Sequence, residues 1–255
     1  MRQGLGVAAA LSALALLATA AGCGAETVKK PLGAGFQRLD RGTQVLDLSS
    51  RDHTGLGLSH LPKIALTVPD GWFNYDGWAL GKAPPARKDS PSLPPDAIRP
   101  VFVTFWDVAS VYPTPCDWAG KPLVDPGPGV DGLASALSRQ PLRNATTPTD
   151  VALGGFHGKY LRWSVPTDIA FDEKRRSKAL FPRCDEKTFQ SWTGSGWASD
   201  RYEQAPAQVD MLWILDVHGQ RLVVDASYLS EATAADRTEL DGVVHSIQFM
   251  RRDGS

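Results

Sequence analysis

The sequence predicts an α+β domain with a mainly antiparallel sheet, a helix in the middle of the domain and a second helix near the C-terminus. Three observations support this class. Apolar runs of strand length recur along the chain after residue 60. Two segments, residues 125–141 and 230–249, carry apolar residues at helical spacing. Strands and helices do not alternate one for one, so the βαβ units of a parallel sheet are not indicated.

The N-terminal segment, residues 1–22, has the features of a secretory signal peptide. Arg2 gives a positive start, an apolar run extends from Leu5 to Leu17, and only small residues follow up to Gly22. The apolar run is shorter than the roughly 20 residues that a membrane-spanning helix needs. Cleavage is therefore expected.

The expected cleavage site ends in the sequence AAGC, residues 20–23. It resembles the lipobox of bacterial lipoproteins, in which the cysteine sulfur is alkylated by a diacylglycerol and the chain is cut just before that residue. The resemblance implies lipidation at Cys23 and a place on the outer face of the cell membrane. The alternative is a secreted protein cut after Ala20, which leaves Cys23 as a free thiol in an oxidising compartment.

The other two cysteines, Cys116 and Cys184, are the remaining thiols of an exported chain if Cys23 carries lipid. A disulfide between them is therefore expected. A metal site built on both thiolates is the weaker alternative, because the sequence has no C-x-x-C or H-x-x-x-H spacing. No metal and no other cofactor is predicted.

The charge balance gives no indication of nucleic-acid binding. Removing residues 1–22 takes away one basic residue, Arg2, so 27 basic residues become 26 against 28 acidic ones, a net charge of −2. Such a chain has no long-range field that attracts nucleic acid. The densest basic run, residues 173–178, is interpreted as a solvated loop rather than a phosphate or membrane contact.

Composition divides the mature chain into two parts. Residues 23–60 contain few long apolar side chains and are expected to form a flexible tether, with a short ordered piece at residues 43–50. Residues 61–250 are expected to form a single α+β domain. Within it, the Pro-rich residues 81–100 are expected to be a loop.

The first elements of the domain follow from local patterns. Residues 63–68 alternate as a β-strand and end at the turn sequence Pro69-Asp70-Gly71. Residues 101–111 are almost continuously apolar and aromatic, which predicts one buried strand. The middle helix follows a Gly- and Pro-rich stretch. Its apolar face consists of Val130, Leu133, Ala134 and Leu137.

The later elements have stronger signals. Residues 149–166 are expected to form two strands joined through Gly154-Gly155, with Leu161, Trp163 and Val165 on one face of the second strand. Residues 208–230 predict a hairpin that turns at His218-Gly219. Ser230 or Thr233 can cap the last helix. The apolar face of that helix consists of Leu240, Val243, Val244 and Ile247.

The order of these motifs carries a resemblance. VPDGW after a strand, a middle helix followed by VALGGFHGKYLRW, and a closing helix ending in VVHSIQF resemble a domain of actinobacterial secreted lipoproteins and membrane-anchored sensors. That domain is similar in plan to the PsbP-like α/β/α sandwich. The resemblance covers residues 60–250 and implies a fold and an extracytoplasmic role. It offers no catalytic residue to transfer.

No catalytic residue is predicted from the sequence either. G-x-S-x-G, a P-loop and a strand-following G-x-G-x-x-G are all missing from it. None of the histidines stands at helical ligand spacing from another; they are His53, His60, His157, His218 and His245. A pocket that joined His157 to acidic residues would indicate an enzyme.

The segment SWTGSGWASDRYE is the predicted recognition site. Trp192, Trp197 and Tyr202 stand there among Gly, Ser, Thr and Asp, a mixture typical of interaction surfaces. The alternative is that this loop folds back over the sheet edge and buries the rings.

These observations predict a lipid-anchored, extracytoplasmic binding or interaction module that is not catalytic and whose ligand is unknown. Its expected contacts are the membrane, through Cys23, and an envelope protein or glycan, through a concave sheet face or the loop at Trp192. The alternative is an envelope-acting hydrolase whose active site the sequence does not reveal.

Overall fold

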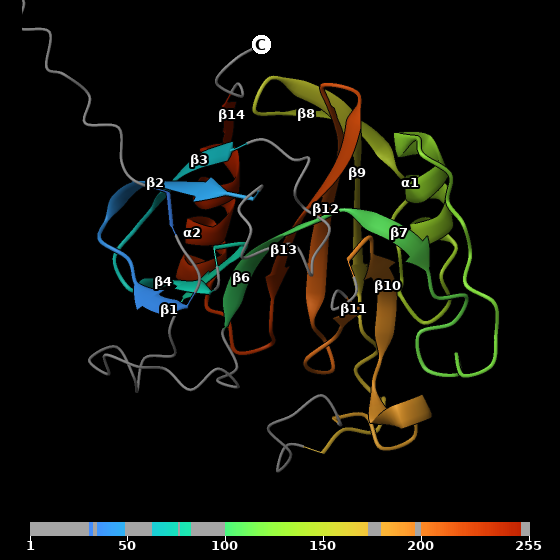
Figure 1. Ribbon diagram of the computed structural model, residues 1–255. Helices are drawn as coiled ribbons and strands as arrows, with labels where there is room; N and C mark the ends of the chain where they lie inside the picture. Colours follow the sequence, from blue (N-terminus) through green and yellow to red (C-terminus); the bar gives the residue numbers. More distant parts are fainter. Residues whose placement is uncertain are drawn as a thin grey trace, which may run out of the picture.

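The computed structural model describes residues 31–32, 35–48, 63–75, 77–82, 100–172, 180–196 and 200–250. They form mainly antiparallel sheets with a middle helix, α1 (Val130–Ser138), and a C-terminal helix, α2 (Ala234–His245) (Figure 1). This is the predicted α+β class. The leader with Cys23, the Pro-rich residues 83–99, the basic run at 173–178 and Trp197 lie outside the described residues.

The largest sheet has eight strands, and each neighbouring pair is antiparallel. In spatial order they are β1 (Phe36–Arg38), β4 (Trp72–Tyr75), β5 (Ala79–Lys82), β6 (Val101–Trp106), β13 (Gln220–Tyr228), β12 (Val209–Val217), β9 (Phe156–Ser164) and β8 (Thr149–Leu153). Strand β12 lies near the middle, where Trp213 stands opposite Tyr160 of β9 and Val224 of β13.

Two three-stranded sheets pack beside the large one. One contains β2 (Gly42–Asp47), β3 (Lys63–Val68) and β14 (Gln248–Met250). The other contains β7 (Val108–Val111), β10 (Gln190–Gly194) and β11 (Asp200–Tyr202). A short 3-10 helix, Asp185–Lys187, precedes β10.

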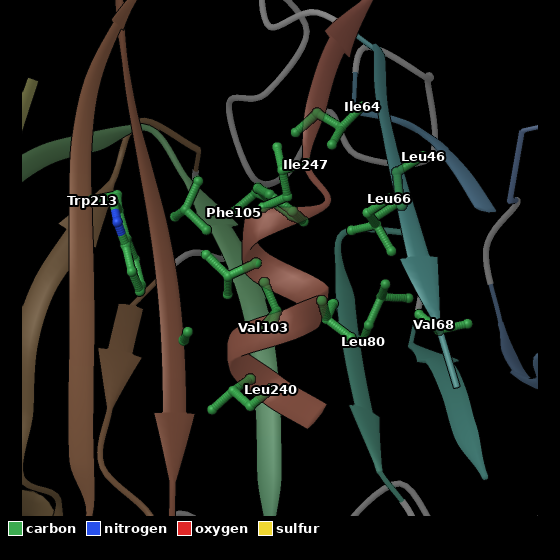
Figure 2. Close-up of a cluster of buried hydrophobic side chains, with 14 of the residues drawn as sticks. Leu46, Ile64, Leu66, Val68, Leu80, Val103, Phe105, Trp213, Leu240 and Ile247 are labelled. Atoms are coloured by element: carbon green, nitrogen blue, oxygen red, sulfur yellow. The ribbon is translucent and has the colours of Figure 1, made fainter. Parts of the chain in front are cut away.

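The two faces of the large sheet have separate cores. On one face, α2 packs between β6 and β3, with Leu240 and Ile247 among Val103, Phe105 and Leu66 (Figure 2). On the opposite face, α1 packs on β9 and β12 and shares a core with β7 and β10. Successive residues of the central strands point to opposite sides, so both faces of the sheet carry apolar side chains. One helix covers part of each face.

The strongest sequence signals are confirmed. Strand β3, helix α1 and the hairpins β8–β9 and β12–β13 lie where they were predicted. His218 and Gly219 both have positive φ, 57° and 79°, as a two-residue hairpin turn requires. Thr233 is the N-cap of α2, and its capping box with Asp236 settles the choice between the two candidate caps.

Several expectations differ from the structure. Ile247 was expected on the apolar face of the last helix, but α2 ends at His245, and the residues that follow Ile247 form β14. Residues 101–111 are not one strand, because Asp107 separates β6 of the large sheet from β7 of a small one. This break puts Trp106 and Val108 into the same core. Residues 36–38 and 42–47 lie in the expected tether but form β1 and β2, which pair with β4 and β3. The ordered piece expected at 43–50 corresponds to β2.

Candidate functional site

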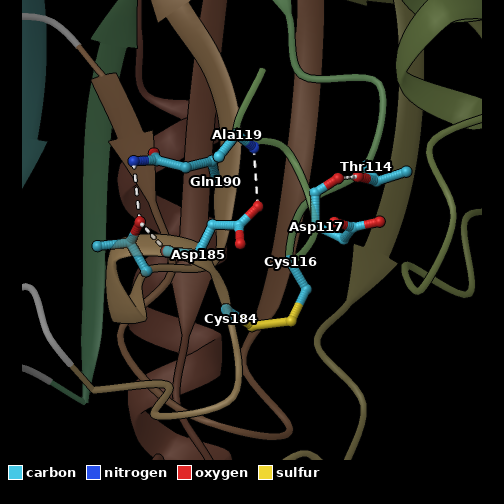
Figure 3. Close-up of a disulfide and its surroundings, with 8 residues drawn as sticks. Thr114, Cys116, Asp117, Ala119, Cys184, Asp185 and Gln190 are labelled. Carbon is cyan, nitrogen blue, oxygen red and sulfur yellow. Dashed lines mark hydrogen bonds between the residues drawn. A yellow bond between two sulfur atoms is a disulfide. The ribbon is translucent and has the colours of Figure 1, made fainter. Parts of the chain in front are cut away.

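The expected disulfide is present. Cys116 and Cys184 are joined with a Cα–Cα distance of 4.4 Å, which links the loop after β7 to the start of the 3-10 helix (Figure 3). Asp185 reinforces this junction, because its backbone N–H donates to the Cys116 carbonyl at 2.8 Å and its carboxylate accepts from Ala119 N–H at 2.7 Å. The disulfide and these hydrogen bonds therefore hold the loop after β7 against the segment that leads into β10.

The predicted recognition residue Trp192 is not on the surface. Its side chain is fully buried on β10, with its ring stacked 5.8 Å from Trp163 and edge-on 5.7 Å from Trp106. The expectation that Trp192 contacts a partner is therefore corrected. The small polar neighbour Ser191, which suggested a surface loop, is itself buried and hydrogen-bonded to Glu203. Tyr202 is half-buried at the end of β11.

The segment around Trp192 instead closes over a set of buried charges that sequence reasoning missed. This ionic cluster consists of Arg143, Arg201, Glu203, Asp210 and Asp225, and each of these side chains is at most 4% exposed. It lies on the α1 side of the large sheet, beneath β10 and β11. Buried charges at this density require mutual pairing, because each one loses its hydration on folding.

Arg201 is the centre of the ionic cluster. Its Nε donates to Asp225 Oδ2 at 2.7 Å, and its Nη2 donates to Asp210 Oδ1 at 3.0 Å. Its Nη1 lies 3.3 Å from Glu203 Oε2. One guanidinium from β11 therefore holds a carboxylate from each of two central strands, which ties the small sheet to the large one.

Arg143 enters the ionic cluster from the segment after α1. Its Nη1 lies 2.9 Å from Glu203 Oε1, and its Nε donates to Gln140 Oε1 at 2.9 Å. The guanidinium stacks on the Trp163 ring, 4.2 Å from its centroid, and on Phe189. These contacts replace the water that the buried cation has lost.

Burial opposes full ionisation of the ionic cluster. Two guanidiniums against three ionised carboxylates leave a net charge of −1 in a water-free interior, which is unfavourable. Burial raises the pKa of Glu203 to about 7 against the pull of Arg201, and burial likewise raises the pKa of Asp225. Burial acts on Asp210 in the same sense, but the charges of Arg201 and Arg143 bring its pKa below the ordinary value.

Ser227 links the two aspartates of the ionic cluster. Its hydroxyl lies 2.5 Å from Asp210 Oδ1 and 2.6 Å from Asp225 Oδ1, and its single proton can be donated to one of them only. Its oxygen accepts a hydrogen bond from Arg201 Nη2 at 3.3 Å. Both oxygens of Glu203, by contrast, face donors, namely Ser191, Arg143, Gln208 and Arg201.

The ionic cluster is closed to ligands, because every charged side chain in it is buried. Its function is to join layers of the fold. A sequence signal for it exists: Asp210 and Asp225 interrupt the apolar strands VDMLWILDV and QRLVVDASY. An acidic residue in a central buried strand predicts a buried cation, although the sequence does not say which arginine supplies it.

The opposite side of the same strands presents a partly exposed surface. Tyr160 and Arg162 of β9, Met211 and Trp213 of β12, and Tyr228 of β13 project to the α2 side of the sheet; these five residues are called the aromatic face. Helix α2 packs mainly on β6, β13 and β3. Trp213 is almost covered, whereas Tyr160, Met211 and Tyr228 are half-buried and Arg162 is exposed.

The rings and cations of the aromatic face contact one another. Tyr160 packs against Trp213 with ring centroids 5.0 Å apart. Arg162 Nη2 donates to the Tyr228 hydroxyl at 3.0 Å, and Arg237 of α2 lies 5.5 Å from the Tyr228 ring centroid. Burial raises the pKa of the Tyr160 phenol. Among the charged groups near it, Arg162 opposes this rise and Asp241 of α2 adds to it.

The histidines do not assemble into a catalytic set within the described part of the chain. His157 is exposed on β9, His218 is a turn residue, and His245 pairs with Asp241 on α2 at 3.2 Å. Across the residues that the structure describes, no three His, Cys, Asp or Glu side chains group closely enough to hold a metal ion. Neither described helix is long and apolar enough to cross a membrane.

Comparisons with known proteins leave the family open. No family model and no curated protein matches the chain. Among solved structures, the chain is similar to LpqN, a protein involved in cell envelope biogenesis of Mycobacterium tuberculosis. The TM-score is 0.36 and the sequence identity 12%, over 74% of this chain and 84% of that one.

Proposed function

We propose that the protein is a lipid-anchored, extracytoplasmic binding module that holds an envelope ligand against the aromatic face and does no chemistry on it. The leader and the AAGC sequence favour export and an anchor at Cys23. One helix on each side of the large sheet fits the plan of a PsbP-like α/β/α sandwich. We assign ligand binding to strands β9, β12 and β13 on the α2 side of the large sheet.

The observation that carries this function is the composition of the aromatic face. Tyrosine, tryptophan and arginine are the residue types that contribute most to binding interfaces, because they bury a large area and lose little side-chain freedom. Here Tyr160 and Arg162 on β9 and Tyr228 on β13 stand on the two strands that flank β12, with part of their surface exposed. A rigid surface loses less entropy on binding than a loop does.

The anchor is tested by changing Cys23 to Ala. Loss of the acyl chains should move the protein from the membrane fraction to the soluble fraction, because two or more chains hold a protein at a bilayer where one does not. The measurement is the distribution of the protein between the two fractions after cell lysis. An unchanged distribution contradicts the anchor and leaves the binding surface to be judged separately.

Binding is tested with insoluble envelope material from the cells that make the protein. The fraction of protein that sediments with this material is compared for Tyr160→Ala, Met211→Ala and the control Tyr202→Ala. Changes on the aromatic face should weaken binding about tenfold, as expected for removing a central contact. The control should bind as the parent does.

Two outcomes contradict the proposed surface. In one, both face variants bind normally while their thermal midpoints match the parent. In the other, Tyr202→Ala alone loses binding, which returns recognition to the segment between Ser191 and Tyr202.

A further inference from the structure

Two arginines converge on one tyrosine of the aromatic face. Arg162 reaches the Tyr228 hydroxyl from β9, with a distance of 3.0 Å from its Nη2. Arg237 reaches the ring of the same tyrosine from α2, with its Cζ 5.5 Å from the centroid. Both side chains are exposed. Two elements far apart in the sequence thus bring two positive charges to one ring.

Neither arginine is neutralised within the described residues. The ion pairs formed there involve other cations: Lys63, Lys82, Lys121, Lys159, Arg143 and Arg201. Asp241 of α2, whose charge acts on the Tyr160 phenol, lies 3.2 Å from His245 Nδ1. Arg162 and Arg237 therefore keep guanidinium N–H groups available to a ligand.

This arrangement favours an anion. Two cations placed at one half-buried ring repel each other, and an anionic group between them removes the repulsion. A guanidinium also offers paired N–H donors whose spacing matches a carboxylate or a phosphate. The half-buried Tyr160 and Tyr228 rings beside them offer flat apolar surface to the rest of the ligand.

We infer that the aromatic face binds an acidic glycan, whose carboxylate or phosphate is held by Arg162 and Arg237 and whose sugar ring lies against Tyr160 and Tyr228. The inference rests on the proposed function and adds the charge of the ligand to it. A sugar fits the surface because it combines an apolar ring face with polar edges, as the aromatic face combines flat rings with charged and hydroxyl groups.

The test is calorimetric titration of the protein, purified in detergent from the cells that export it, with tetragalacturonate and with its neutral methyl ester. The two probes share the same sugar chain, and in the ester a methyl group replaces the negative charge of each carboxylate. The acidic probe should bind at least about tenfold more tightly than the ester, since each charge-assisted hydrogen bond is strong. Arg162→Gln and Arg237→Gln should each weaken binding of the acidic probe about tenfold.

Arg183→Gln is the matched control, because Arg183 is also exposed but lies beside the disulfide. It should bind tetragalacturonate as the parent does, and all three variants should keep the parent's thermal midpoint. Equal affinity for the acid and the ester overturns the inference, as does failure of millimolar tetragalacturonate to bind. Equal loss of binding in Arg183→Gln overturns it as well.

A second arm separates a glycan from a membrane surface. Vesicles of phosphatidylglycerol are added in place of the oligosaccharide. Binding to these vesicles that depends on Arg162 and Arg237, without binding of tetragalacturonate, assigns the arginines to anionic lipid and overturns the glycan. If Tyr160→Ala loses envelope binding while both arginine variants retain it, the proposed function stands and only the acidic ligand is wrong.

Discussion

Trp192 stabilises the core between the small sheet and the large one. Its ring is fully buried and contacts Trp106 and Trp163. Changing Trp192 to Ala leaves a large cavity and should lower the free energy of unfolding by about 3–5 kcal/mol. Urea denaturation measures this loss. Leu123→Ala serves as the control, because Leu123 is 44% exposed and its truncation should change stability by less than about 0.5 kcal/mol.

A loss below about 1 kcal/mol for Trp192→Ala contradicts its burial and restores it as a surface residue.

Asp225 is the residue at which the ionic cluster should tolerate a neutral side chain. Asparagine keeps an oxygen for Arg201 and gains an N–H for the Ser227 oxygen, so Asp225→Asn mimics the protonated acid. At neutral pH its free energy of unfolding should stay within about 1 kcal/mol of the parent. Asp210→Asn should instead cost about 3–5 kcal/mol, because it removes the carboxylate that faces Arg201 Nη2 and the Ser227 hydroxyl and leaves the two buried guanidiniums with less opposite charge.

The pH dependence of Asp225→Asn follows from the direction of the pKa shift. Burial raises the pKa of Asp225, so between the ordinary value of 3.8 and the raised pKa of the folded state, the folded protein holds a proton that the unfolded protein releases. This group therefore makes the parent less stable as pH rises. The stability of Asp225→Asn relative to the parent should increase with pH in urea titrations. A flat or falling difference contradicts the bound proton.

Single residues also show what the sequence conceals. The polar neighbours of Trp192 suggested a surface, but the Ser191 hydroxyl donates a hydrogen bond to the buried Glu203. Asp210 and Asp225 were visible as acids in apolar strands, yet their partners Arg143 and Arg201 come from irregular or short segments. Such pairings depend on tertiary packing, which local patterns do not encode.

Among the elements, α2 has an N-terminus that is fixed by the side chain of its N-cap residue. Thr233 accepts a hydrogen bond from Asp236 N–H at 3.1 Å, while the Asp236 carboxylate accepts from Thr233 N–H at 2.9 Å. Thr233→Ala should lower the free energy of unfolding by about 1 kcal/mol. Ser230→Ala should change it by less than about 0.5 kcal/mol, because Ser230 lies outside the cap. Equal costs for both variants contradict this start.

The disulfide constrains the elements between its two ends. It closes a separation of 68 residues that includes α1, β8 and β9. In the chain-entropy model, the double variant Cys116→Ala/Cys184→Ala should lose roughly 4 kcal/mol of stability. The measurement is urea denaturation beside the unreduced parent. Two alkylatable thiols in the unreduced, unfolded parent, at positions 116 and 184, would falsify the bridge.

Long, regular elements were predictable and short ones were not. The β12–β13 hairpin and α2 combine periodic apolar residues with a turn or cap, so local and tertiary preferences agree. Strands β1, β11 and β14 have three residues each, too few for any period to show. The break at Asp107 was hidden because both of its flanks are apolar.

At the scale of the whole molecule, the two faces of the large sheet carry different side chains: buried charges on one face and partly exposed aromatic rings on the other. Strands β12 and β13 direct Asp210, Asp225 and Ser227 to the α1 side, where the ionic cluster joins the layers. The alternate residues Met211, Trp213 and Tyr228 face the α2 side. A concave sheet face was one of the two recognition surfaces that the sequence suggested. We propose the aromatic face as that surface, and its residues follow only from the register of β9 against β12.

The aromatic face is the proposed binding surface, and hydroxyl-radical footprinting tests this proposal most directly. Met211, Tyr160 and Tyr228 are oxidisable and half-buried, so their oxidation rates report whether a ligand covers them. Adding insoluble envelope material should slow oxidation of all three severalfold and leave Tyr202 unchanged. Unchanged rates at the three face residues, or protection of Tyr202 alone, would contradict the claim.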